Sequence, residues 1–415
     1  MPSVVHTTLA ALFSLLLLVV SGCAPPPLGN PQLPYPGVRP PEVGEILHLA
    51  TGVSVSEKQM LAVLGDARIV YVGETHDNPA SHRLELAVLQ EMARRHPGNI
   101  ALGMEMFTPS QQGVLDDWVA GRLDEKTFLK RVRWFEAWGM EFDYYRDLLD
   151  FARREGIPIL GLNAEKSLVS AVKEKGLAGL SDEERQLLPE MDLEEPYQRA
   201  QTTAIFGGHD QGGRHLERFL QIQTLWDETM AYNIAAYLTG PAGSGKRLVV
   251  VAGGNHVRYG FGIPRRVFRR LPTSYALVGT REILIPEEKQ ESLMDVETPD
   301  FPMRPYDFIL HCAYESLEKK EVKLGVLLGT DTGRVAVEGV VPESNAEAAG
   351  LQKGDLLLAI DGEAIGDSFD LTYRVKQKRP GDRGTLLIER EGKEESVEVL
   401  FQEPRAMRSH GQPKE

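Results

Sequence analysis

The chain has 415 residues, 42% of them apolar and 26% charged, and its formal net charge at pH 7 is −14. This is the composition of a globular protein, and it excludes a mainly disordered, collagen-like or multi-spanning membrane chain. The acidic balance argues against nucleic-acid binding, which depends on Lys and Arg neutralising phosphates. The length predicts two or three domains. With only two cysteines, Cys23 and Cys312, no disulfide framework or four-cysteine zinc site can form.

Residues 1–22 are predicted to form a lipoprotein signal peptide. The apolar run from Leu12 to Val20 is too short for a membrane span, which takes about 20 apolar residues, and it suits the core of a secretory signal. The run ends in Val20-Ser21-Gly22-Cys23, which resembles a bacterial lipobox, although no Lys or Arg precedes it. The resemblance implies cleavage before Cys23 and lipidation of that cysteine.

Residues 23–44 are predicted to be a proline-rich tether. Eight prolines lie between Cys23 and Pro41, and such a segment stays extended. A lipid anchor followed by a stiff spacer holds a soluble domain away from a membrane. Ala24 follows the cysteine in place of Asp, which in proteobacterial sorting implies the outer membrane. We therefore expect a protein of the bacterial cell envelope that faces the periplasm.

Residues 45–310 are predicted to form one α/β domain. Its strands are short apolar runs without polar alternation, a pattern typical of strands buried on both faces of a mostly parallel sheet. Helical patterns, such as Ser81 to Arg95 and Phe219 to Leu238, separate them. The predicted strands are Ala67–Val72, Asn99–Met104, Ile157–Leu162, Arg247–Ala252 and Tyr275–Gly279.

Residues 321–402 are predicted to form a second, small and mainly-β domain, with one helix near Ser368–Lys378. Short apolar strands and Gly-Asp turns fill the rest of it. The polar tail, residues 403–415, is expected to stay outside this domain.

Acidic and imidazole side chains follow the predicted strands. Glu74 and His76 come after the first strand, Glu105 after the second and His256 after the fourth. Ligands of open parallel sheets bind beyond the carboxyl ends of the strands, so we expect these residues to lie at one edge. They could hold a divalent metal ion or act as a general acid and base. A purely structural role, in hydrogen bonds at strand ends, stays open for each of them.

Three further residues are candidate haem ligands. Tyr259 follows His256 by three positions, and His209 and His215 lie in a glycine-rich segment. Tyrosinate and histidine both ligate haem iron. Aromatic side chains between Trp134 and Tyr145 could form a flat apolar wall, or could simply pack in the core.

Several motifs together resemble ChaN-type lipoproteins. They cover about residues 60–285 and imply haem binding by a homodimer in iron acquisition, without assigning the ligand among Tyr259, His209 and His215. The motifs are Gly73-Glu74-Thr75-His76, Met104-Glu105-Met106-Phe107, Trp226-Asp227-Glu228-Thr229 and Gly254-Asn255-His256.

The same fold family is similar to the TraB/Tiki and erythromycin-esterase groups, some of which are metal-dependent hydrolases with paired Gly-x-x-His motifs. That similarity implies a divalent metal ion held by His76, Glu105 and His256. Glu74 or Glu105 would then be the catalytic base. Whether the chain is an enzyme stays open at this point.

The last domain resembles a bacterial PDZ domain. The resemblance is carried by Lys323-Leu324-Gly325-Val326, by the segment from Val340 to Asp355 and by Ile360-Asp361-Gly362. It implies that the loop of Leu324, Gly325 and Val326 captures the C-terminal carboxylate of a peptide or protein partner. The expected function is thus a lipid-anchored haem-binding protein with a peptide-binding module. A metal-dependent hydrolase or peptidase is the alternative, and a scaffold without a ligand is a third possibility.

Overall fold

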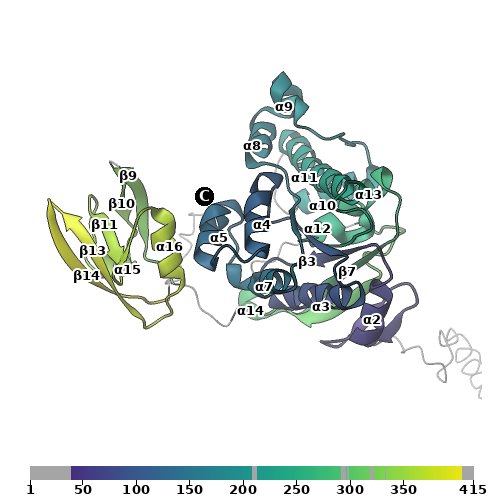
Figure 1. Ribbon diagram of the computed structural model, residues 1–415, viewed down its shortest axis with the longest axis horizontal. Helices are drawn as coiled ribbons and strands as arrows, with labels where there is room; N and C mark the ends of the chain where they lie inside the picture. The colour runs from purple at the N-terminus through teal and green to yellow at the C-terminus, as the bar shows by residue number, and fades with distance from the viewer. Residues whose placement is uncertain are drawn as a thin grey trace, which may run out of the picture.

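The computed structural model describes residues 39–207, 213–290, 296, 299–317, 322–331 and 333–403. Figure 1 shows a larger unit, in which helices cover a central sheet, beside a smaller unit built mainly of strands. The predicted fold class is therefore confirmed: a mostly parallel sheet with flanking helices, followed by a small antiparallel β unit. The expected signal peptide, residues 1–22, lies outside the described residues, as do Cys23 and most of the proline-rich tether.

The sheet of the larger unit contains eight strands among the described residues, in the order β2-β1-β8-β7-β3-β6-β4-β5. The five predicted strands correspond to β3 to β7, and β3 pairs in parallel with both β6 and β7. At one edge of the sheet, β1 pairs in antiparallel orientation with both β2 and β8. The strands are β1 (Ile46–His48), β2 (Val53–Val55), β3 (Ile69–Glu74), β4 (Ile100–Met104), β5 (Ile159–Gly161), β6 (Arg247–Gly253), β7 (Tyr275–Leu284) and β8 (Phe308–Ala313).

Alternate residues of β3 enter two separate cores. Val70 and Val72 pack in the core beneath α3 and α7, whereas Ile69 and Tyr71 pack in the core beneath α11 and α13. This alternation follows from the two-residue period of a strand covered by helices on both faces. The helices are α2 (Glu57–Leu64), α3 (Pro79–Arg95), α4 (Gln112–Val119), α5 (Glu125–Arg131), α6 (Trp134–Ala137), α7 (Arg146–Glu155), α8 (Lys166–Lys175), α9 (Asp182–Gln186), α10 (Pro196–Gly207), α11 (Gly213–Thr239), α12 (Gly254–Val257), α13 (Ile263–Arg270) and α14 (Glu287–Gln290). None of the described helices combines the length and apolar character needed to cross a bilayer.

The smaller unit has an antiparallel sheet in the order β14-β13-β11-β10-β9, with β12 paired to β11. Its core contains Leu371 and Val375 of α16 together with Leu386 and Ile388 of β13. Its elements are β9 (Val326–Asp331), β10 (Arg334–Val340), α15 (Asn345–Ala348), β11 (Leu356–Ile360), β12 (Glu363–Ala364), α16 (Ser368–Lys376), β13 (Arg383–Arg390) and β14 (Lys393–Leu400).

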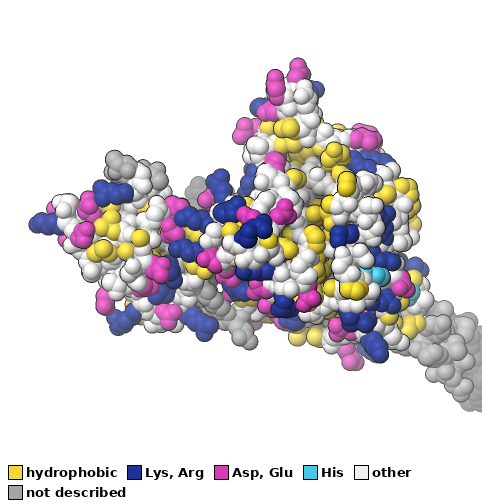
Figure 2. Space-filling model, in the orientation of Figure 1, with side chains coloured by type: hydrophobic (Ala, Val, Ile, Leu, Met, Phe, Trp, Pro, Cys, Tyr) yellow, Lys and Arg dark blue, Asp and Glu magenta, His cyan; other side chains and the backbone are white. Residues whose placement is uncertain are grey.

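Helix α16 joins the smaller unit to α5 and α6 of the larger one (Figure 1). The rings of Phe135 and Phe369 stack with their centroids 5.4 Å apart. Asp370 accepts from Lys126 at 3.1 Å and from Lys130 at 3.2 Å. Figure 2 shows basic and acidic side chains next to one another where the units meet. The contact thus combines one apolar stack with several ion pairs.

Candidate functional site

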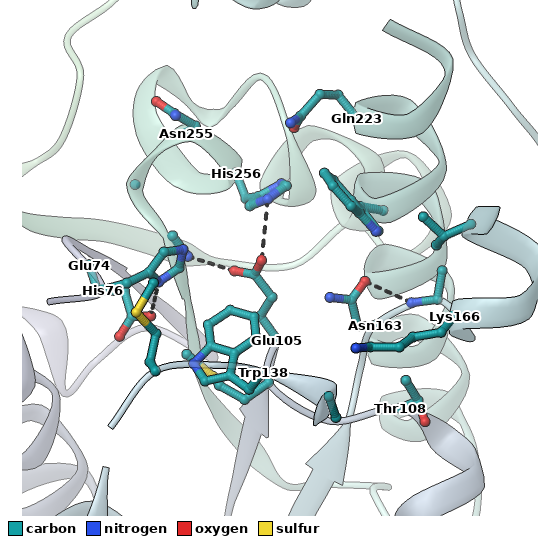
Figure 3. A pocket seen from close by; sticks show the side chains of 18 of the residues that line it. Glu74, His76, Glu105, Thr108, Trp138, Asn163, Lys166, Gln223, Asn255 and His256 are labelled. Carbon is teal, nitrogen blue, oxygen red and sulfur yellow. Dashed lines mark hydrogen bonds and ion pairs between the residues drawn. The ribbon is translucent and has the colours of Figure 1, made fainter. Parts of the chain in front are cut away.

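A cavity of about 1500 Å³ opens at the carboxyl ends of β3, β4, β5 and β6. The strand ends and the segments that follow them supply Glu74, His76, Glu105, Asn163 and His256 to its lining, and Figure 3 shows these side chains around it. The sequence predicted that the polar residues after the strands share one edge. The structure places them there because the carboxyl ends of parallel strands lie side by side.

Glu74 and His76 form a hydrogen-bonded pair in the cavity wall. Nδ1 of His76 lies 2.5 Å from Oε1 of Glu74, and the hydroxyl of Tyr145 donates to the same oxygen at 3.0 Å. Burial opposes charge on His76, but the hydrogen bond and charge of Glu74 raise its pKa to about 9. The ring of Trp138 meets the His76 ring edge-on, with centroids 5.0 Å apart. Glu74 and Trp138 therefore fix the orientation of this imidazole, and Tyr145 holds Glu74 in place.

His256 is held by a second carboxylate, on α11. Its Nδ1 lies 2.7 Å from Oδ1 of Asp227, and its Nε2 lies 3.4 Å from Oε1 of Glu105. The other oxygen of Glu105 accepts from the backbone N–H of Gly253 at 2.7 Å. Burial raises the pKa of Glu105, but the charge of His256 outweighs it and brings the pKa down to about 2. Glu105 is therefore an anion beside His256.

Gly253, the last residue of β6, leaves room for the His76 ring beside Glu105. A Cβ atom at this position would lie 2.9 Å from Cε1 of His76 and 3.6 Å from Oε2 of Glu105. Any larger residue would push the His76 ring aside. The structure thus brings together all four residues predicted after the strands, with Glu105 between the two histidines.

A second group of buried ligating side chains lies behind Glu74. Oε2 of Glu74 and Oε2 of Glu85 lie 3.4 and 3.1 Å from Nδ1 of His82. Burial and the charge of Glu85 raise the pKa of Glu74 to about 8, and burial raises the pKa of Glu85 to about 7. Among the described residues, this trio brings its ligand atoms within 4.8 Å of one another.

No site role was predicted for His82, Glu85 or Asp227, although Asp227 lies in one of the ChaN-like motifs. His82 and Glu85 are three residues apart and face Glu74 from one side of α3. That spacing within Ser81-His82-Arg83-Leu84-Glu85 was a usable signal, because positions i and i+3 share one helix face.

The family described as "Haem-binding uptake, Tiki superfamily, ChaN" matches residues 60–267, half of the chain. The chain belongs to the ChaN family. A PDZ domain matches residues 322–400, so this ChaN-family chain also carries a PDZ domain, a module that binds peptides and proteins.

Individual relatives match only in part. "Protein RETICULATA-RELATED 5, chloroplastic" of Arabidopsis thaliana is 24% identical over 368 residues, which cover 81% of this chain and 46% of that protein. A "Probable periplasmic serine endoprotease DegP-like" of Marinomonas sp. (strain MWYL1) is 35% identical over 66 residues, 16% of this chain and 14% of that protein. The chain therefore spans less than half the length of these curated relatives. The solved structure titled "Cofacial heme binding to ChaN of Campylobacter jejuni" is 15% identical, covers 64% of this chain and 95% of that one, and has a TM-score of 0.49.

None of the three candidate haem ligands is among the described residues that line the cavity of the ChaN-type domain. Tyr259 does not line the cavity; its ring stacks on Phe261, with centroids 5.3 Å apart, and contacts Phe301. His215 is exposed near the start of α11, and His209 lies outside the described residues. The cavity itself offers His76 and His256 as its histidines among the described residues.

The predicted carboxylate loop of the PDZ domain begins at a buried residue. Leu324 is buried in the domain core, and Val326 packs against that core at the start of β9. Gly325 between them has φ +86°, and a Cβ there would lie 2.2 Å from Cβ of Ser344. This position needs glycine for both its backbone angle and its close contact.

Proposed function

We propose that the ChaN-type domain binds haem in the cavity at the carboxyl ends of the strands. Ligand pockets commonly have volumes of about 300–1,000 Å³, and this cavity of about 1500 Å³ is large enough for a porphyrin. Its lining combines apolar side chains with cations suited to haem propionates. These residues include Met106, Trp138, Met140, Arg131, Arg133, Lys166 and Lys173.

The Glu74–His76 pair is the observation that carries this proposal. Metal-bound histidines commonly donate their second ring nitrogen to a carboxylate, and Nδ1 of His76 is held by Glu74. Nε2 is then the ring nitrogen that remains free to bind iron. A bound haem supplies an iron centre that accepts an axial imidazole. Trp138 orients the His76 ring and adds apolar surface beside it.

A haemin titration of the full chain tests this function. We expect a saturable Soret shift that weakens at least tenfold in His76→Ala. Tyr259→Phe, His209→Ala and His215→Ala serve as comparisons and should bind as the unmodified chain does. Loss of binding only in one of these three would move the ligand to that residue, and an unsaturable shift would contradict haem binding. Light scattering with and without haemin tests for the homodimer.

We further propose that Cys23 anchors the chain to a bacterial membrane, facing the periplasm, and that the PDZ domain recruits a peptide or protein there. The lipobox-like segment and the prolines after it support the anchor. Cys23→Ala should move the protein from the membrane pellet to the supernatant after a carbonate wash. Retention of the variant in the pellet would contradict the anchor.

A metal-dependent hydrolase or peptidase is the second candidate function. The observation that favours it is that His76 and His256 each meet a carboxylate at Nδ1, with Glu105 between them. Two oriented imidazoles and a carboxylate suit a catalytic divalent ion. Peptide hydrolysis that needs added metal and is lost in Glu105→Gln would support this function. Its absence across Zn²⁺, Mn²⁺ and Co²⁺ would count against it.

A further inference from the structure

Glu74, His82 and Glu85 lie between the end of β3 and the first turns of α3, behind the cavity wall. Their relative exposures are 4%, 6% and 0%. Two carboxyl groups and an imidazole are seldom buried together without a compensating charge or proton, because burial of an unpaired polar group is unfavourable.

The hydrogen bonds of His82 determine where its proton lies. Nε2 is 3.0 Å from the backbone carbonyl oxygen of His76, which can only accept, so Nε2 carries the hydrogen. Burial lowers the pKa of His82 and favours the neutral ring. Nδ1 of that ring is a lone pair, and it faces carboxylate oxygens of Glu85 and Glu74 at 3.1 and 3.4 Å. With Nδ1 unprotonated, this arrangement needs either a proton shared with the carboxyl groups or a cation between the three side chains.

Two of the carboxylate oxygens in this group are also unpartnered. Oε2 of Glu74 and Oε1 of Glu85 are buried and have no hydrogen-bond partner among the described residues. Oε1 of Glu74 is already used by His76 and Tyr145. The unpartnered oxygen of Glu74 is the one that faces His82.

We propose that Glu74, His82 and Glu85 bind one divalent transition-metal ion. One imidazole nitrogen and carboxylate oxygens are ligands suited to Zn²⁺, Mn²⁺ or Fe²⁺, and the three residues bring their ligand atoms within 4.8 Å of one another. The site is separate from Glu105 and His256 and does not depend on haem binding. Because Glu74 also holds His76, the ion would be linked to the cavity through a shared carboxylate.

Metal binding to the full chain tests this site directly. The protein is stripped with a chelator, equilibrated with Zn²⁺, Mn²⁺ or Co²⁺ in the absence of haemin, and analysed for bound metal. We expect one ion per chain, bound at least tenfold more weakly in Glu85→Gln and in His82→Asn. Glu91→Gln, on the same helix but paired with Arg94, is the matched control and should bind as the unmodified chain does.

A spectroscopic measurement keeps the test independent of how the variants fold. X-ray absorption of the Zn²⁺-loaded, unmodified chain should show a single imidazole with oxygen ligands. Two imidazoles would assign the ion to His76 and His256 and overturn the proposal. Absence of bound metal in the unmodified chain would also overturn it, because the buried group would then be compensated by protons. Binding lost in Glu105→Gln but kept in Glu85→Gln would overturn it as well.

Discussion

Nδ1 of His256 lies 2.7 Å from Oδ1 of Asp227, and this contact turns Nε2 of the ring toward Glu105. The two residues come from different layers, since Asp227 belongs to α11 and His256 to α12 after β6. Asp227 is itself held by the side-chain amide of Gln198. A helix packed over the sheet thus orients an imidazole at the strand ends.

Asp227→Asn should lower the pKa of His256. Burial opposes the charge on this ring, while the charges of Glu105 and Asp227 raise its pKa well above the usual value. Replacing Asp227 by a neutral amide removes one of those charges. Side-chain ¹⁵N NMR should show a ring that stays protonated through neutral pH in the unmodified chain and titrates at lower pH in the variant. Glu217→Gln, in an exposed pair, is the control, and an unchanged His256 titration would contradict the prediction.

Gly253→Ala should displace His76 with little change in the fold. The new Cβ would lie 2.9 Å from Cε1 and 3.0 Å from Nε2 of that ring. Overpacking in a close-packed region costs roughly 1–3 kcal/mol, and less where a side chain can move. Ligand affinity in the cavity should fall about tenfold or more, measured by titration, as expected when a ligating group is misplaced. Gly113→Ala, where nothing lies within 4 Å, should leave the affinity unchanged; equal effects of the two changes would refute this explanation.

Gly325→Ala should destabilise the PDZ loop and weaken peptide binding. The residue would adopt φ +86° and place its Cβ 2.2 Å from Cβ of Ser344. The backbone strain alone is worth about 1–2 kcal/mol, and the clash adds to it. Gly333→Ala has a similar φ of +79° but nothing within 4 Å, so the difference between the two variants isolates the clash. Unchanged peptide affinity in Gly325→Ala, measured by calorimetry, would mean that the groove binds in another way.

Asp370→Asn should weaken the contact between the two units in a pH-dependent manner. Burial raises the pKa of Asp370, but hydrogen bonds from Lys126 and Lys130 outweigh it and hold the pKa below 3.8. The stabilisation is therefore complete above pH 3.8 and is lost as the pH falls through the lowered, folded-state pKa. Urea unfolding at pH 7 should show a loss of about 1 kcal/mol, and this difference should disappear in acid. Glu398→Gln, in an exposed pair, should show neither effect.

The central strands could be predicted because each is a continuous apolar run buried on both faces. Strands β1, β2 and β8 were missed. β1 and β2 have three residues each and stand outside any longer apolar run, and His311 interrupts the apolar run of β8. The polar residues at the ends of β3, β4 and β6 could also be predicted, because the end of each apolar run marks where the strand ends. A residue at that point of the chain lies at the carboxyl edge of the sheet.

The partners of these residues could not be predicted in the same way. Asp227 lies on α11, far along the chain from Glu105, and its side chain enters the site only because α11 packs over the sheet. His82 and Glu85 lie on α3, and charged residues of a helix that packs on a sheet usually face the solvent. Their burial depends on the way α3 packs against β3 and α7. Helix packing is a tertiary outcome that the local sequence pattern does not determine.

The edge-on contact between Trp138 and His76 gives the protein an optical reporter of its own. Indole emission responds to groups that come within a few ångströms, and a porphyrin bound near this histidine would absorb the emitted light. Cavity occupancy could therefore be followed in the intact chain without any attached dye. The signal from Trp138 can be separated from that of the other three tryptophans by comparing the chain with Trp138→Phe.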